Sequence, residues 1–139
     1  MKKSIFKTTA IVLFVALFVN STLLKAQEKK TEWKEKNDFH SVMSATFHPS
    51  EEGNLEPIKN RSGELVESAK AWMNSTPPKE FDNPKVKKTL KKLYKNSVAL
   101  DKMIKNKASD EKIKTSLSKL HDIFHQIVEI CRHKDGEGH

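Results

Sequence analysis

One stretch near the C-terminus decides the fold: Leu117-Ser118-Lys119-Leu120-His121-Asp122-Ile123-Phe124-His125-Gln126-Ile127-Val128-Glu129-Ile130-Cys131-Arg132-His133. Its apolar residues recur at intervals of three and four, which is the spacing of one face of an α-helix. The stripe consists of Leu117, Leu120, Phe124, Ile127 and Cys131. Such a stripe predicts a helix that packs against other helices.

Two histidines border this stripe. His121 and His125 are four residues apart, so their rings stand one turn apart on the same face of the predicted helix. Neighbouring imidazoles can share a metal ion, and a single imidazole can bind haem iron. The alternative is that both are amphipathic residues at the helix flank, with packed rings and hydrated nitrogens.

The N-terminus has the pattern of a secretory signal peptide. A basic start at Met1–Lys7 precedes the apolar run Ala10–Val19, and small and polar residues follow as far as Ala26. The run is shorter than the ~20 apolar residues that span a bilayer. We therefore expect residues 1–26 to be removed, leaving a periplasmic or secreted protein with no stable membrane anchor.

The composition of residues 27–139 is that of one small domain. Without the four lysines of the signal segment, 22 basic and 18 acidic residues remain, a charge of about +4 that lends little support to nucleic-acid binding. Cys131 is the single cysteine, so an internal disulfide is excluded. Stability is expected to come from core packing, with a cofactor as a further contribution.

The remaining pattern is all-α. Glycine is scarce and no alternating strand pattern occurs, and helices are expected at about 31–47, 56–75, 84–105 and 110–132. The first should stop at Phe47 because His48 precedes Pro49, and a residue before proline is pushed away from helical angles. Asn83 and Ser109 are expected to cap the third and fourth helices. Four helices with short links predict an up-down-up-down antiparallel four-helix bundle.

In that topology the first and last helices are neighbours. His40 and Met43 then lie within about two turns of His121 and His125, given a rise of ~1.5 Å per residue. Cofactor sites in bundles are built in this way, from side chains on facing helices. His48, with Glu51 or Glu52, is a candidate for a second and looser site; alternatively, it interacts with the carbonyls at the end of the first helix.

The arrangement resembles the cytochrome c-prime and cytochrome b-type four-helix bundles. The features in common are Met43 on the first helix, a loop rich in proline and glycine, the segment Leu65–Trp72, and a closing helix that bears histidine. In b-type members a methionine of the first helix and a histidine of the last bind haem, so the resemblance implies Met43 with His121 or His125 as ligands. The C-x-x-C-H motif of c-prime members is missing because Cys131 stands alone, and covalent haem attachment is not expected. The chain therefore resembles a divergent exported member without that motif.

Three functions follow from these observations. The first is binding of a transition metal, copper or zinc, through His40, Met43, His121 and His125, with His48 as a further candidate ligand. Imidazole suits both ions, and a thioether favours reduced copper. The second is non-covalent haem binding for electron transfer, with Met43, His121 and His125 as the candidate ligands. The third is a cofactor-free adaptor or stress-type binding module. No catalytic motif is present, and an enzyme is not expected.

A further candidate surface is the third helix. Its lysines form either a solvated face or a docking surface for an acidic protein or anionic lipid. They are Lys85, Lys87, Lys88, Lys91, Lys92 and Lys95. No aromatic residues alternate with them as base stacking requires, so nucleic acid is not the expected partner. The sequence leaves open whether the protein is a monomer or a dimer.

Overall fold

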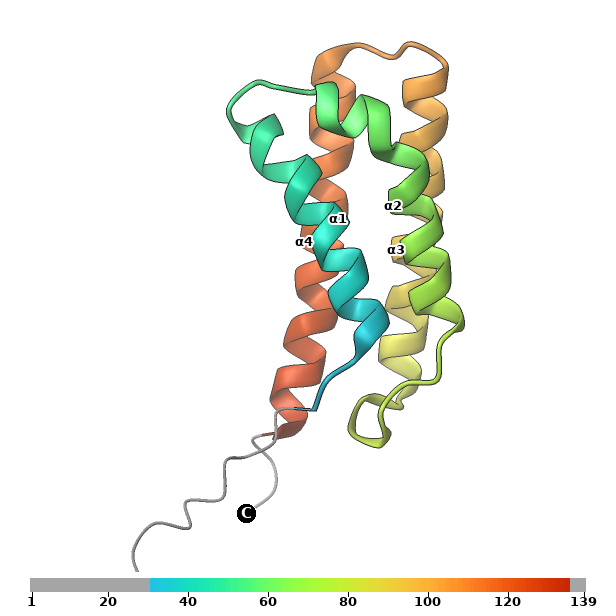
Figure 1. Ribbon diagram of the computed structural model, residues 1–139. Coiled ribbons are helices and arrows are strands. Elements are labelled where there is room, and N and C mark those ends of the chain that lie inside the picture. Colours follow the sequence, from blue (N-terminus) through green and yellow to red (C-terminus); the bar gives the residue numbers. More distant parts are fainter. Residues whose placement is uncertain (1–30, 136–139) are drawn as a thin grey trace, which may run out of the picture. The chain divides into compact units, whose positions relative to one another are not determined.

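The computed structural model describes residues 31–135, which form four α-helices and one 3₁₀ turn (Figure 1). The helices are α1 (Lys34–Glu51), α2 (Glu56–Asn74), α3 (Pro84–Lys105) and α4 (Asp110–Asp135), and the turn η1 (Lys79–Phe81) lies between α2 and α3. No strand occurs in this part of the chain, which confirms the all-α prediction. The expected signal segment, residues 1–26, lies outside the described residues.

The four helices form a bundle around one hydrophobic core. Each helix packs against the next along the chain, and α1 also contacts α4. The largest fully buried side chains come from all four helices: Phe39, Met43, Ile58, Leu65, Trp72, Leu93, Leu100, Ile113, Leu117, Leu120, Ile123 and Ile127. Within residues 31–135 no helix combines the length and the apolar character needed to cross a membrane.

Two of the expected helix starts are capped as predicted. The side chain of Asn83 accepts a hydrogen bond from the backbone N–H of Val86 at 2.9 Å, and Pro84 occupies the first position of α3. Ser109 Oγ accepts a longer bond of 3.4 Å from the N–H of Lys112 at the start of α4. The bounds of α2, α3 and α4 lie within three residues of those expected.

Helix α1 does not end at Phe47 as expected. It continues through Pro49 to Glu51. The chain then turns away from the helix at Gly53, whose φ is +88°, a conformation that glycine adopts without strain. The N–H groups of Gly53 and Asn54 bond back to the carbonyls of Ser50 and Pro49, at 3.1 and 2.9 Å, which is the Schellman pattern of a helix C-terminus. His48, the residue before Pro49, thus keeps helical angles despite its preference for extended ones, and the helix ends at this Schellman motif instead.

The extra turn is also stabilised from inside the bundle. Ser50 is buried, and its hydroxyl donates to the carbonyl of Phe47 at 2.6 Å. Because residues 48–51 are helical, His48 and Glu51 belong to α1 and lie on the same helix face as residues one turn before them. The extra turn therefore determines which α1 side chains lie near the histidines of α4.

At the N-terminal end of α1, aromatic rings pack the chain against α2. Trp33 is buried, and its ring packs edge-on against Trp72 at a centroid distance of 5.6 Å. Its Nε1–H donates to Ser75 Oγ at 2.8 Å. Phe81 of η1 stacks on the same ring at 6.2 Å, so the long link between α2 and α3 is also attached to the core.

Candidate metal centre on helices α1 and α4

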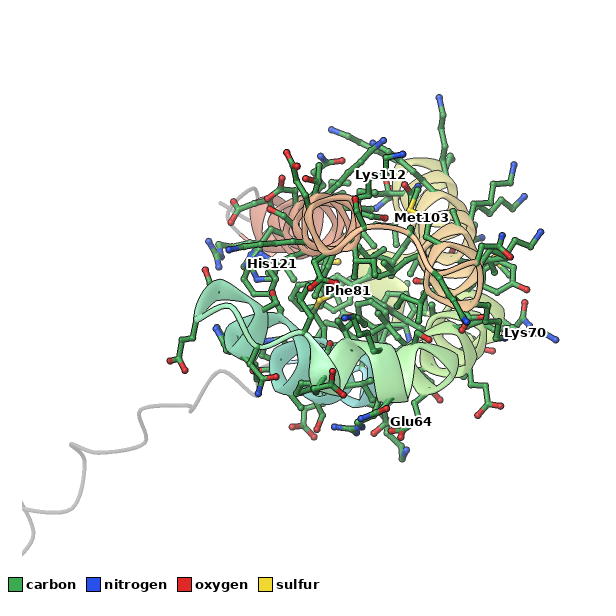
Figure 2. All side chains as sticks on the ribbon, turned by 90° about the horizontal axis from the view of Figure 1, so that it is seen from above. Glu64, Lys70, Phe81, Met103, Lys112 and His121 are labelled. Atoms are coloured by element: carbon green, nitrogen blue, oxygen red, sulfur yellow. The ribbon has the colours of Figure 1, made fainter. Side chains whose placement is uncertain are left out.

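His121 and His125 form a close pair on the surface of α4. Their Nε2 atoms are 3.1 Å apart, their ring centroids are 4.4 Å apart, and the ring planes are nearly perpendicular at 82°. His121 is half-buried and His125 is exposed. In Figure 2, which looks down on the bundle, His121 lies between α4 and α1. The two Nε2 atoms are thus within hydrogen-bond distance of each other, one ring donating and the other accepting according to their tautomers.

The ring of Phe47 holds His121 from the α1 side. The two rings are stacked, with centroids 3.9 Å apart and planes 10° apart. Phe47 is itself buried among the core residues, so it offers a fixed surface to the imidazole. In this stacked position the Nε2 of His121 lies 3.1 Å from that of His125.

His40 belongs to the same side of the molecule but lies against a different ring. It is exposed and stacks on Phe124 at a centroid distance of 5.0 Å, with the planes 6° apart. Phe124 also meets His125, the next residue in the chain, edge-on at 5.5 Å. His40 and His125 therefore both contact Phe124. Of the two ring stacks between α1 and α4, one joins His40 to Phe124 and the other joins Phe47 to His121.

His48 forms an exposed pair with Glu51. Its Nδ1 lies 3.1 Å from Oε2 of the carboxylate, and its ring meets Phe47 edge-on at 5.7 Å. Phe47 is therefore a common neighbour of His48 and His121. Of the two carboxylates expected near His48, the one that pairs with it is that of Glu51.

The surroundings of His121 favour its neutral form. Partial burial of the ring lowers the pKa of His121 below its ordinary value of 6.5, and the charge of His125 lowers it further. The carboxylates of Asp122 and Glu51 raise this pKa, whereas His48 lowers it further. A neutral imidazole keeps the lone pair that a metal ion requires.

The separation of the two nitrogens suits a shared ion. Two metal–nitrogen bonds of about 2.0–2.1 Å that meet at a near-tetrahedral angle put the nitrogens about 3.3 Å apart. The observed 3.1 Å differs from this by less than ordinary side-chain motion. Among the residues whose side chains are described, no group of three His, Cys, Asp or Glu is arranged to hold an ion. A metal ion at the pair would have two ligands from it, and any further ligand would have to come from rotation of a neighbouring side chain or from water.

The two sulfur side chains lie elsewhere. Met43 is fully buried in the hydrophobic core, and Cys131 is buried near the C-terminal end of α4. Met43 sits one turn before Phe47, on the inner side of α1, whereas the histidine pair is at the surface. The structure therefore brings His121 and His125 together, leaves His40 and His48 beside them on aromatic neighbours, and holds Met43 in the core.

Two contributions to the site were not foreseen from the sequence. Phe47 and Phe124 were expected as core residues, or as the lining of a haem cavity, yet each also stacks on a histidine ring. Spacing alone put Phe47, seven residues after His40, and Phe124, three after His121, on the same helix faces as the histidines, without indicating the contacts between the helices. These intervals return to the same helix face.

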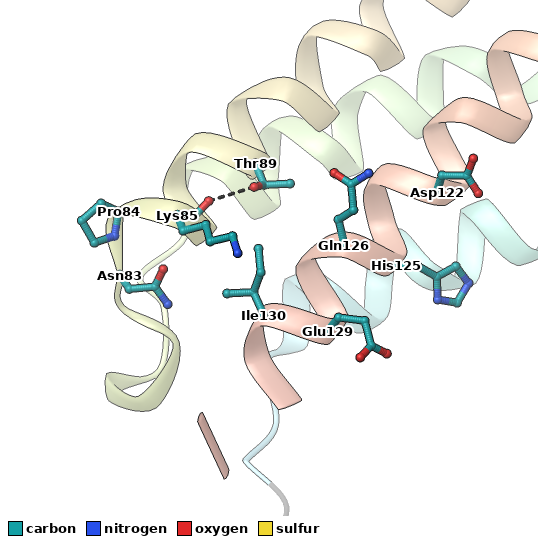
Figure 3. Close-up of a pocket in the computed structure, with 9 residues that line it drawn as sticks. All are labelled: Asn83, Pro84, Lys85, Thr89, Asp122, His125, Gln126, Glu129 and Ile130. Atoms are coloured by element: carbon teal, nitrogen blue, oxygen red, sulfur yellow. Dashed lines mark hydrogen bonds between the residues drawn. The ribbon is translucent and has the colours of Figure 1, made fainter. Parts of the chain in front are cut away.

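The far side of His125 opens onto a groove between the start of α3 and the middle of α4 (Figure 3). Ile130 and Pro84 supply apolar lining, and Asp122, Gln126 and Glu129 line the α4 side. The hydroxyl of Thr89 is used within α3, where it donates to the carbonyl of Lys85 at 2.8 Å. His125 thus connects the histidine pair with an open surface of the bundle.

Comparisons of the chain with protein-family models, with curated proteins and with solved structures found no match.

Proposed function

We propose that the protein binds a transition metal ion, copper or zinc, with His121 and His125 as its central ligands. The observation that carries this proposal is the 3.1 Å separation of the two Nε2 atoms. Imidazole nitrogen is a preferred ligand for both ions. The lowered pKa of His121 favours binding near neutral pH because no proton has to leave that ring.

Residues of α1 complete the site in this proposal. His48 and Glu51 are close enough for their charges to act on His121, and both side chains are exposed and, in the contacts described above, paired with each other. Rotation of His48 away from Glu51 supplies a third ligand. His40 is the alternative third ligand, since it shares Phe124 with His125.

The proposal includes the wider expectations from the sequence. We infer an exported protein, supported by the signal-like pattern of residues 1–26, and an up-down-up-down bundle of the cytochrome c-prime kind. The opposite order of the ring contacts along α1 and α4 supports antiparallel neighbours. Haem binding through Met43 is less favoured, because Met43 has no exposed surface and the core would have to open around it.

The test is a titration of the purified, untagged protein with Cu²⁺ and Zn²⁺, followed by calorimetry. His133 and His139 are replaced by glutamine in every sample, so that tail histidines contribute nothing. One ion per chain is expected. His121→Ala and His125→Ala should each weaken binding by more than the about 10- to 100-fold that loss of an outer-shell partner causes. An absorption spectrum of the same samples detects haem.

The matched control is Gln126→Ala, an exposed neutral residue adjacent to His125. It should bind the ion as the parent does. His40→Ala and His48→Ala identify which α1 histidine is the third ligand, because that variant alone should lose affinity. Unchanged binding in both His121→Ala and His125→Ala, with the helical content retained, would contradict the proposal.

A further inference from the structure

The first half of α3 carries positive charge without any negative charge. The twelve residues from Pro84 to Lys95 contain six lysines and no aspartate or glutamate. Every one of these lysines is exposed. Consecutive lysines of the set lie within about one helical turn of each other, well inside the ~8–10 Å over which salt screens charge. Their repulsion is therefore felt within the set.

Five of the six lysines have no partner of opposite charge among the residues whose side chains are described. Lys87 is the exception, since it pairs with Asp82 at 2.6 Å. By contrast, Lys59 and Lys105 form ion pairs with Asp110 and Asp101. The unpaired set, here called the lysine face, consists of Lys85, Lys88, Lys91, Lys92 and Lys95.

The lysine face lines a groove rather than a ridge. All five lysines border one hollow on the surface of α3, together with Thr89, Asn96 and the α4 residue Gln126. Several of these lysines can therefore contact the same ligand. The groove shares Lys85, Thr89 and Gln126 with the groove that begins at His125, so the two form one continuous surface.

We propose that the lysine face binds an extended acidic segment of another protein. Lys85, Lys88, Lys92 and Lys95 follow one another at three or four residues, about one turn or 5.4 Å apart along the groove. Alternate side chains of an extended chain are about 6.6–6.8 Å apart on one side, a mismatch that flexible lysine stems absorb. Carboxylates on such a chain then meet one lysine after another.

The polar residues of the groove favour a peptide over other polyanions. The amide of Gln126 offers a donor and an acceptor to a peptide backbone, and Asn96, whose Nδ2 donates to the carbonyl of Lys92 at 2.8 Å, offers its amide oxygen as an acceptor. An anionic bilayer surface presents no such backbone. A flat bilayer would contact a convex face and gain from inserted apolar side chains, and this groove is lined by lysine and polar residues. Base stacking, which single-stranded nucleic acids use, requires aromatic residues that the groove lacks.

The experiment is a fluorescence-anisotropy titration of the full protein with a labelled decapeptide of alternating Glu and Ser. Binding is expected at low salt and should weaken as salt is raised. Lys88→Glu with Lys92→Glu should weaken binding about tenfold, because two attractions become repulsions. The matched control, Lys102→Glu with Lys114→Glu, changes net charge equally at exposed lysines outside the groove and should retain the parent affinity within about twofold.

The same titration separates the other partners. A peptide in which Gln replaces every Glu should not bind. Equal weakening by the groove and control variants would overturn the proposal, since net charge alone would then explain binding. Binding of vesicles with 30% anionic phospholipid, or of a uridine decamer, that depends on Lys88 and Lys92 while the acidic peptide fails to bind would also overturn it.

Discussion

The imidazole of His121 lies flat on the ring of Phe47, with the centroids 3.9 Å apart and the planes 10° apart. One ring comes from α4 and the other from α1, so the contact fixes the position of a surface histidine by a residue of the core. The pairing of His121 with His125 thus depends on a helix to which neither residue belongs.

Replacement of Phe47 by leucine should disturb this arrangement. The variant keeps an apolar side chain but loses the flat surface, and the free energy of unfolding should fall by about 1–2 kcal/mol. The ring of His121 should become mobile, and the chemical shifts of its ring signals should spread over a narrower range. Urea unfolding gives the stability, and metal titration gives the affinity, which should fall although both ligands are present. An affinity equal to that of the parent would show that α4 alone orients the pair.

The stability should depend on pH through His121. Because the folded-state pKa is lowered, the unfolded chain binds a proton more readily, so folding stability is complete above pH 6.5 and falls as the pH drops below it. Urea unfolding at several pH values between 5 and 7.5 measures this slope. His121→Gln should reduce the slope, and His125→Gln should raise the pKa of His121, as followed by NMR. An unchanged slope in His121→Gln would rule out this contribution.

A polar contact between α2 and α3 offers a second test of stability. Ser62 is buried, and its hydroxyl donates to Asp101 Oδ1 at 2.8 Å. Burial by itself raises the pKa of Asp101, but hydrogen bonds from Lys105 and Ser62 outweigh it and hold that pKa below its usual value. Ser62→Ala should cost about 0.5–1.5 kcal/mol in the free energy of unfolding and raise the pKa of Asp101. Urea unfolding and a carboxyl NMR titration measure the two effects.

The two glycines of the described helices and turns should respond in opposite directions to alanine. Gly53 has a φ of +88°, so Gly53→Ala should destabilise the protein by about 1–2 kcal/mol despite the open space around it. Gly63 lies within α2 with no atom near the site of a Cβ, so Gly63→Ala should stabilise by about 0.5–1 kcal/mol. Thermal unfolding of both variants checks the pair. A loss of stability in both would contradict the assignment of Gly63 to a regular helix.

The sequence predicted the helices well where periodicity and caps agreed. Helix α3 was placed at 84–105, which are its observed bounds, because Asn83-Pro84 is a strong start and the apolar stripe continues to Ile104. Helix α1 was ended four residues early because the rule for a residue before proline is local. The buried hydroxyl of Ser50 and the turn at Gly53 are features of the folded state that outweigh it.

The candidate site was predictable only in part. The spacing of His121 and His125 placed them on one face, and their proximity is observed. The orientation of a ring depends on what it packs against, and no spacing rule assigns His121 to Phe47 or His40 to Phe124. Met43 illustrates the reverse case: it is on the expected helix, yet its side chain turns into the core.

The aromatic contacts described above form one uninterrupted series from the histidine pair to the centre of the bundle. His125 meets Phe124 at 5.5 Å, and Phe124 meets the buried Trp72 at 6.0 Å. If copper binds at the pair as proposed, the ion would lie two ring contacts from the indole of Trp72, and its binding is expected to reduce the emission of that ring. Occupancy of the surface site would then be followed as a change in the light that the core emits.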